Sequence, residues 1–123
     1  MTLLLDTHAF LWWDSNDSNL PEALRLAIAS PENEIFVSAV TVWEIAIKRA
    51  SAKLTFVGAA ANAIQTHGFL PLPISVYHAE AAGALEQLHR DPFDRLLVAQ
   101  ARLEGLVLVT VDEKILRYPV PHL

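Results

Sequence analysis

Two aspartates follow apolar segments that are expected to form buried strands. Asp6 comes directly after Leu3–Leu5, and Asp112 lies shortly after the segment 106–109. In open parallel α/β sheets, functional side chains gather beyond the carboxyl ends of the strands, especially where the strand order reverses. We therefore expect these two carboxylates to lie at one edge of a sheet, where they could take part in a reaction.

Two more acids are expected on helices that turn them toward the protein. Glu44 shares a helical arc with Val40, Trp43 and Ile47, on a face that is largely apolar. Asp94 begins a helical stripe that continues with Leu97. A carboxylate on an inward face needs a partner, because burial disfavours its charged form.

A shared pocket for these acids would be a cluster of like charges, with no Lys or Arg in their segments expected to compensate it. Such a cluster is stable only around cations, because like charges at close range oppose ionisation. Magnesium and manganese are the natural choice, since these hard ions take oxygen ligands and bind substrate phosphates. The pocket predicts hydrolysis of a phosphodiester by water whose pKa the ion lowers. The expected ligands and catalytic residues are Asp6, Glu44, Asp94 and Asp112.

Each of these acids also has a purely structural interpretation. Asp is a favoured N-cap residue, so Asp6 and Asp112 could each do no more than begin a helix. Glu44 could pair with Lys48 on an exposed helix face, an i,i+4 arrangement worth about 0.3 to 0.5 kcal/mol. These alternatives stay open at the level of sequence.

Asp91 and Asp94 lie at the start of the helix that is expected to begin with Pro92. We interpret Asp91 as the N-cap, and Asp94 could simply favour the helix dipole. The histidines show no spacing typical of a zinc site, and the tryptophans fit core or interface positions better than base stacking. No chemistry is assigned to His8, His67, His78, His89, His122, Trp12, Trp13 and Trp43.

The composition excludes several classes of protein. With 123 residues, 53% of them hydrophobic, the chain is expected to form one domain over 1–123. Without cysteine it has no disulfide, thiolate zinc site or cysteine nucleophile. No apolar run reaches the roughly 18 residues of a membrane helix, and Asp6 stands too early for a signal peptide. A cytoplasmic protein without a membrane contact is expected.

The formal net charge of −5 has the wrong sign for a broad nucleic-acid-binding surface. Bound cations would cancel part of the acidic cluster, and the basic residues fall into two groups, over 48–53 and 90–102. Arg95 and Arg102 are expected on a helix face other than that of Asp94. We predict that these two arginines contact nucleic-acid phosphates.

The expected elements alternate between apolar strands and helices. Strands are expected near 3–5, 35–37, 69–74 and 106–109, the third as a short edge strand that contains two prolines. Helices are expected near 9–13, 21–30, 38–50, 57–67, 75–89 and 92–105, with a last turn at 113–117. Tyr77 is assigned to the inward stripe of its helix. The alternation predicts an α/β fold whose mainly parallel sheet is flanked by helices on both faces.

Four segments carry a resemblance to a known family. They read LLLDTH at 3–8, VWEIAIK at 42–48, HRDPFDRLLVAQA at 89–101 and VTVD at 109–112. In this order and spacing they resemble PIN-domain proteins of the VapC-like toxin type. The resemblance covers essentially the whole chain, and the second and third segments are the most specific.

The resemblance implies that the acidic pocket binds magnesium or manganese and cleaves single-stranded or loop RNA, leaving a 5′-phosphate. Thr7 and Thr110 match hydroxyl positions that help to orient an acid or a water. The resemblance also implies a homodimer and a VapB-like antitoxin, whose tail lies across the toxin groove and places an Arg near the acids. One departure is Ala52, where similar sequences have Gly, so the end of the helix that carries Glu44 is expected to differ.

Other classes fit the sequence less well. A phosphatase of the haloacid-dehalogenase type has a second Asp two positions after the first, where this chain has His8. A phospho-accepting receiver domain needs a Lys near the acids after its last core strand, and Lys114 lies too far along the chain. Two alternatives within the fold stay open: an RNA-processing nuclease without an antitoxin, and a catalytically silent binding module.

Overall fold

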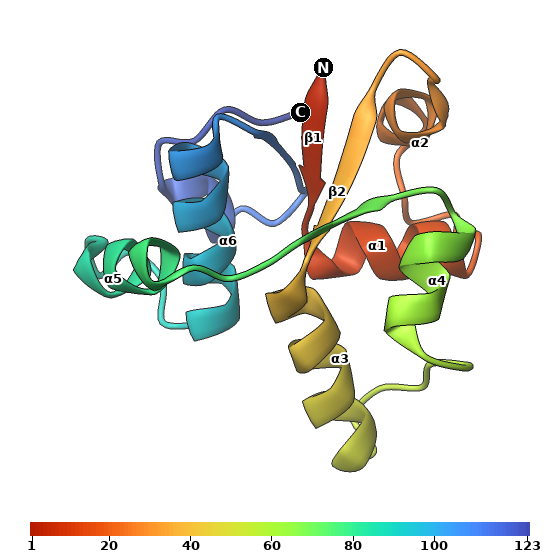
Figure 1. Ribbon diagram of the computed structural model, residues 1–123, viewed down its shortest axis with the longest axis horizontal. Coiled ribbons are helices and arrows are strands. Elements are labelled where there is room, and N and C mark those ends of the chain that lie inside the picture. Colours follow the sequence, from red (N-terminus) through yellow and green to blue (C-terminus); the bar gives the residue numbers. More distant parts are fainter.

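The computed structural model describes residues 1–123 and contains one four-stranded sheet (Figure 1). All of its strand pairs are parallel, and the strand order is β3-β2-β1-β4. The expected parallel sheet is thereby confirmed, and the segment with two prolines forms an edge strand, as predicted. The strands are β1 (Thr2–Leu5), β2 (Glu34–Ser38), β3 (Leu70–Leu72) and β4 (Val107–Val109).

The strand order reverses between β1 and β4. From β1 the chain adds β2 and β3 on one side, and β4 then pairs with the other side of β1. Leu5, at the end of β1, is in register with Val37 of β2 and Val109 of β4. The residues that follow β1 and β4 therefore emerge together at the point where ligand sites form in open α/β sheets.

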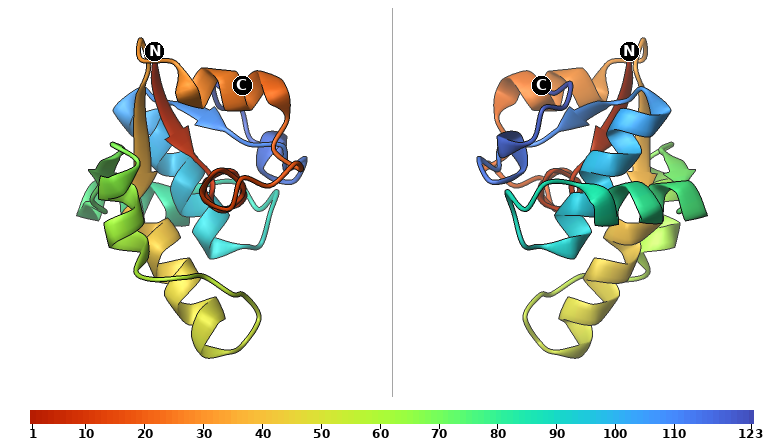
Figure 2. Two further views of the ribbon diagram at one scale, coloured as in Figure 1. Left: turned by 90° about the vertical axis from the view of Figure 1, so that its right-hand side faces the viewer. Right: turned by 90° about the vertical axis from the view of Figure 1, so that its left-hand side faces the viewer.

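Helices cover both faces of the sheet (Figure 1). Helices α5 and α6 lie on one side of the strands, whereas α1, α2 and α4 lie on the other, and α3 extends beyond the carboxyl end of the sheet (Figure 2). No helix has the length and apolar character needed to cross a membrane. The helices are α1 (Thr7–Asp14), α2 (Glu22–Ala29), α3 (Ala39–Ala50), α4 (Ala60–Thr66), α5 (Val76–Ala84), α6 (Pro92–Glu104) and the 3₁₀ turn η1 (Ile115–Arg117).

Strand β1 supplies apolar side chains to both cores. Leu3 and Leu5 pack into the cluster on the side of α1, α2 and α4, and Leu4 packs into the cluster on the side of α6. All three leucines are fully buried, and each contributes about 1.5 to 3 kcal/mol relative to an exposed side chain. The central position of this strand explains its continuous apolar run and fixes the place at which Asp6 emerges.

The helix ends predicted from capping residues are confirmed. The side chains of Ser38, Ser75 and Asp91 accept backbone hydrogen bonds at the starts of α3, α5 and α6. Gly105 ends α6 with a φ of +66°, a left-handed conformation that glycine adopts without a Cβ clash. The caps set the two helices that carry Glu44 and Asp94 in their positions relative to the sheet.

Helix α5 differs from the sequence expectation in its length and its inward face. It ends at Ala84, because the guanidinium of Arg95 binds the carbonyl oxygens of Ala82 and Leu85 and turns the chain away. The assignment of Tyr77 to the inward stripe is wrong, since Tyr77 is 74% exposed. The neighbouring His78 is buried instead, and its Nδ1 atom accepts a hydrogen bond from the backbone N–H of Ser75, the N-cap residue of α5.

Candidate active site

Asp6 is both a helix cap and a buried acid. Its Oδ1 accepts a hydrogen bond from the backbone N–H of Ala9 at 2.8 Å, and the residue is only 3% exposed. Burial raises the pKa of the Asp6 carboxyl, hydrogen bonds from Thr110 and Ala9 lower it, and the nearby charge of Asp112 raises it further. The structural interpretation of Asp6 is therefore correct, but it leaves a desolvated carboxylate beside a second one.

Glu44 is buried on α3, with both carboxylate oxygens engaged. Oε1 accepts a hydrogen bond from the Thr7 hydroxyl at 2.7 Å, and Oε2 binds the Nζ atom of Lys48 at 2.5 Å. The hydrogen bond with Glu44 raises the pKa of Lys48, so this ammonium stays charged. The expectation that no cation compensates the acids is wrong, because Lys48 lies one helical turn beyond Glu44 and spans from solvent into the site.

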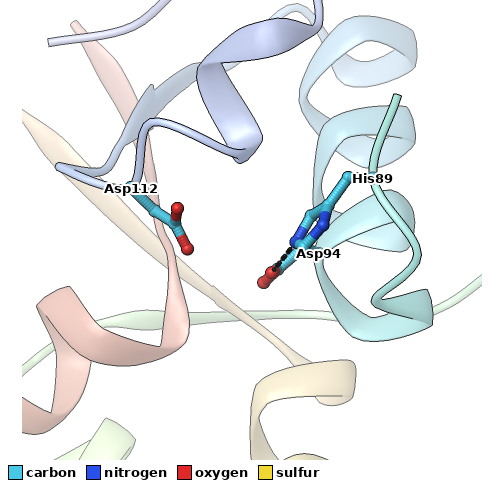
Figure 3. A group of neighbouring side chains, drawn as sticks. All are labelled: His89, Asp94 and Asp112. Atoms are coloured by element: carbon cyan, nitrogen blue, oxygen red, sulfur yellow. Dashed lines mark hydrogen bonds and ion pairs between the residues drawn. The ribbon is translucent and has the colours of Figure 1, made fainter.

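Asp94 and Asp112 approach each other at the entrance to the site, together with His89 (Figure 3). One ligand atom from each of these side chains lies within 4.8 Å of the others. The Nε2 atom of His89 is 2.8 Å from Oδ2 of Asp94, and both side chains are largely buried. Burial, opposed by the hydrogen bond with His89, raises the pKa of Asp94 to about 6, and the charges of Asp91 and Glu44 add to this rise.

The four acids predicted from sequence thus lie in one connected cluster. Asp112 is near Asp94 and acts on the pKa of Asp6, and Glu44 acts on the pKa of Asp94. In each of these three pairs, the two acids come from different parts of the fold. The topological reversal between β1 and β4 brings them together, as the position of Asp6 and Asp112 indicated.

Thr110 connects two of these acids. Its Oγ1 accepts a hydrogen bond from the backbone N–H of Asp112 at 3.0 Å, and its side chain also hydrogen-bonds to Asp6. Asp112 in turn caps the following turn by accepting from the N–H of Lys114 at 2.9 Å. Thr110 therefore links Asp6, which follows β1, to Asp112, which follows β4. Thr7 similarly orients the carboxylate of Glu44.

Two hollows border this cluster. A small cavity of about 210 Å³ has Asp6, His8, Trp12 and Asp112 in its wall. A second one, of about 340 Å³, is lined by basic and polar residues on the side of His89. The largest hollow of the molecule, about 730 Å³, lies elsewhere between α3, α4 and β3, and its lining is mainly apolar. Asp6 and Asp112 therefore face one small hollow, and His89 faces a second, basic one.

Arg95 does not lie where the sequence led us to expect it. It is 7% exposed, and its guanidinium donates to Oη of Tyr118 and to the carbonyl oxygens of Ala82, Leu85 and Glu86 at 2.9 to 3.0 Å. The prediction of a phosphate contact by Arg95 is wrong, because none of this group faces solvent. The buried guanidinium instead fixes the segment 85–91 that precedes α6.

Arg102 is exposed on the same side of α6, but it lies next to α5 and away from the acids. It borders a shallow hollow with Ala81, Ala84 and Leu103. The helix face shared by Arg95 and Arg102 thus packs against α5. A contact between Arg102 and RNA stays a prediction, and its position two turns beyond Asp94 places it outside the acidic cluster.

His89 is the residue at this site that sequence reasoning missed. Its spacing to the other histidines and acids is not that of a zinc site, so the sequence pattern assigns it no chemistry. The chain folds back on itself at Asp91 and Pro92, which brings His89 against Asp94, five residues later. Its place in the HRDPFDR segment, next to the most specific motif, is the signal that could have drawn attention to it.

The donor set fits a divalent cation. The site offers carboxylate oxygens from several elements, burial and neighbouring charges raise the pKa values of Asp6 and Asp94, and a single Lys compensates Glu44. A hard divalent ion takes such oxygen ligands and relieves the repulsion. Asp94 and Asp112 are the pair best placed to hold one ion together.

The family model of the PIN domain matches residues 3–121. The chain belongs to the PIN domain family. A curated PIN-domain relative, Ribonuclease VapC22 of Mycobacterium tuberculosis, is 33% identical over 129 aligned positions, which cover 98% of this chain and 95% of that protein.

Solved structures resemble this PIN domain over its whole length. A toxin–antitoxin complex from Klebsiella pneumoniae matches with a TM-score of 0.67 and 23% identity, covering 98% of this chain and 95% of that one. VapBC2 from Rickettsia felis, bound to a DNA fragment of its promoter, matches with a TM-score of 0.65 and 20% identity, covering 100% and 98%. At these identities the likeness establishes the fold of the chain, which is the one the sequence predicted.

Proposed function

We propose that this PIN domain is a magnesium- or manganese-dependent endoribonuclease that hydrolyses phosphodiester bonds in single-stranded or loop RNA. The observation that carries the proposal is the connected cluster of four acids, two of which have pKa values raised by burial. The identity with Ribonuclease VapC22 supports the choice of RNA as substrate. The proposed catalytic and metal-binding residues are Asp6, Glu44, Asp94 and Asp112.

When bound, the divalent ion would lower the pKa of the attacking water and stabilise charge on the phosphoryl oxygens. Asp94 and Asp112 would hold the ion together, and the Asp6 carboxylate would add negative charge to the site. Thr7 and Lys48 orient Glu44, so that its carboxylate keeps one position during the reaction. In-line attack of water with departure of the 3′ oxygen leaves a 5′-phosphate on the product.

The RNA path requires positive charge beside the acids, and the chain supplies it next to His89. The cavity of about 340 Å³ on that side is lined by Arg90, Lys114 and Arg117. All three basic residues are exposed. We propose that this basic groove, defined by Arg90, Lys114 and Arg117, binds the phosphates that flank the cleaved bond, in the role that Arg95 cannot fill.

We further propose that the protein is the toxin of a toxin–antitoxin pair and that its antitoxin is VapB-like. Support comes from the similar solved structures, among them VapBC-1 of nontypeable Haemophilus influenzae, with a TM-score of 0.62 and 17% identity, covering 100% of this chain and 97% of that one. The apolar groove between α3, α4 and β3 provides a surface that a partner segment could cover. Co-purification of the chain with the product of a neighbouring short reading frame, and loss of RNA cleavage in that complex, would support this assignment.

A homodimer is the expected state of the isolated chain. Val76 and Tyr77 are neighbours at the start of α5 and are 77% and 74% exposed, so they could contribute apolar contacts to a dimer interface. Light scattering measures the mass directly, and Tyr77→Glu should shift it toward the monomer. A monomeric parent chain would contradict the proposal.

The decisive experiment on activity is cleavage of a structured RNA by the purified chain with magnesium, with manganese and with chelator. Cleavage should need the ion and should be lost in Asp112→Asn. Asp14→Asn is the matched control, because Asp14 pairs with His67 away from the cluster. A folded parent chain that cleaves no RNA with either ion would favour the silent binding module. If the chain cleaves RNA and its genome carries no antitoxin gene, the result would favour an RNA-processing nuclease.

A further inference from the structure

His89 lies just before α6, close to Asp94 in the first turn of that helix and to Asp112 after β4. Its Nε2 atom lies 2.8 Å from Asp94, and ligand atoms of His89, Asp94 and Asp112 all lie within 4.8 Å of one another (Figure 3). Two atoms that bind one ion at about 2.1 Å are about 3 Å apart in adjacent positions and about 4.2 Å apart in opposite positions. The three side chains therefore need only small rotations to bind the same ion.

The protein holds His89 through its backbone, and the imidazole is directed toward the acids, where it pairs with Asp94. The backbone N–H of His89 donates to Oη of Tyr118 at 3.1 Å, and its carbonyl oxygen accepts from the Arg95 guanidinium at 3.4 Å. The same guanidinium also binds the carbonyl oxygen of Glu86 at 3.0 Å. A buried Arg thus fixes the segment that carries His89, while the imidazole itself contacts Asp94.

Other histidines of the chain also pair with acids, but without a third ligand nearby. His67 lies 2.8 Å from Asp14, and His78 lies 3.0 Å from Glu104. Neither pair belongs to a group of three residues that could hold an ion, whereas His89 does. The pairing alone is therefore common in this molecule, and the convergence with a second carboxylate from another element distinguishes His89.

We propose that His89 is a ligand of the divalent ion, together with Asp94 and Asp112, and that it makes the site prefer manganese to magnesium. This inference rests on the proposed function, since it concerns the same site. Carboxylates bind both ions, whereas imidazole suits transition metals and is a poor ligand for magnesium. The nitrogen donor therefore selects the identity of the ion and leaves the role of the acids unchanged.

Electron spin echo spectroscopy of the manganese-loaded protein tests the proposal directly, because a nitrogen bound to Mn²⁺ modulates the echo of its unpaired electrons. The parent chain should show the modulation of a directly bound imidazole, and labelling its histidines with the heavy nitrogen isotope should change that signal. The signal should be absent in His89→Gln. His67→Gln is the matched control, since it removes a His–Asp pair of the same length away from the site.

Calorimetric titration with Mn²⁺ and Mg²⁺ gives the second measurement. His89→Gln should weaken manganese binding by about 10- to 100-fold and magnesium binding much less, so that the preference between the ions disappears. Melting in chelator checks that the variant is folded. If it is not, the echo of His8→Gln decides the matter, because His8 is the other histidine that borders the acids. A signal that persists in that variant comes from His89, and a signal that disappears comes from His8.

The outcomes separate this inference from the proposed function. A parent chain that binds manganese without a nitrogen signal, or that keeps its preference in His89→Gln, would overturn the role of His89 alone. Loss of the signal in His8→Gln in place of His89→Gln would do the same. A parent chain that binds neither ion would contradict the metal-dependent nuclease itself.

Discussion

Each acid of the site has a structural contact as well as a proposed role in catalysis. Asp6 caps α1, Asp112 caps the turn after β4, and Glu44 binds Thr7 and Lys48. The structural and functional interpretations left open by the sequence are therefore not exclusive. Asp6 and Glu44 are also buried, so a variant at either changes folding and chemistry together, whereas Asn at Asp94 or at Asp112 keeps an oxygen that can accept the existing hydrogen bond.

RNA binding at the basic groove is expected to depend on salt. Lys114→Ala and Arg90→Ala should each weaken binding of a non-cleavable RNA, more at low salt than at high salt. Each lost phosphate contact should reduce the slope of log affinity against log salt by about 0.7 for a single strand. Fluorescence anisotropy over a salt series measures this slope.

Arg102→Ala is the control for that series, because Arg102 is exposed but lies beside α5. It should change the slope little if the RNA follows the basic groove. A reduction in slope for Arg102→Ala, with none for Lys114→Ala, would show that the RNA follows α6, as the sequence had suggested for that arginine.

Arg95 should instead determine stability. Arg95→Lys cannot reproduce the planar set of donors that binds four carbonyl oxygens and Tyr118. We expect the free energy of unfolding to fall by roughly 3 kcal/mol, since buried acceptors lose their partners. Urea denaturation measures the loss. Equal stability of variant and parent, with weaker RNA binding, would reinstate Arg95 as a phosphate contact.

At the residue scale, the sequence indicated four acids that the structure places near one another, but it did not indicate their partners. Asp6, Glu44, Asp94 and Asp112 could be found because each follows a buried strand or breaks an apolar helix face. The environments of Arg95 and His89 depend on how the segment 85–91 folds back, and no periodicity describes an irregular segment. Side chains that bind backbone carbonyls leave no pattern of their own in the sequence.

At the scale of elements, the turn that follows α3 contains a residue with a strained backbone. Ala52 has a φ of +58°, in the left-handed region that is costly for residues with a Cβ. Similar sequences were expected to have Gly here, and the structure shows the reason. The backbone has the conformation that suits Gly, and Ala52 carries the strain.

Ala52→Gly should therefore raise the melting temperature. Relief of the left-handed strain is worth about 1 to 2 kcal/mol, and the greater freedom of Gly in the unfolded chain removes about 0.4 to 1 kcal/mol of that gain. Ala46→Gly, at an exposed position inside α3, is the matched control and should lower stability by about 1 kcal/mol. The same sign of change for both variants would contradict the interpretation.

The elements themselves were largely predictable, because caps and apolar periodicity are local. Ser38, Ser75 and Asp91 mark the starts of three helices, and Gly105 marks an end. The end of α5 was missed, since a contact with Arg95 on another helix determines it. Tyr77 was placed inward by spacing, although His78 occupies that face by pairing with Glu104.

For the whole molecule, the charged acids of the site should lower the free energy of unfolding when no metal is bound, and a bound metal should restore it. Burial and neighbouring charges raise the pKa of Asp94 from 3.8 to about 6, and they also raise that of Asp6. A carboxyl with a raised pKa binds its proton more tightly in the folded state than in the unfolded state. The resulting stability is fully present below about pH 4 and is lost as the pH rises toward 6. The metal-free parent should become less stable over this window, by on the order of 3 kcal/mol for Asp94.

Asp94→Asn should separate this cost from the rest of the fold. The amide keeps nearly the same shape without the charge, so the metal-free variant should melt at a higher temperature than the metal-free parent at neutral pH and should lack most of the fall between pH 4 and 6. Manganese at a hundred times its dissociation constant should stabilise the parent by about 2.7 kcal/mol, and the variant by less because it lacks one ligand. Thermal melts of both proteins, in chelator and in manganese, measure all of these effects. If the metal-free variant melts lower and manganese shifts both proteins equally, the acids do not share an ion, and hydrolysis at this cluster loses its electrostatic basis.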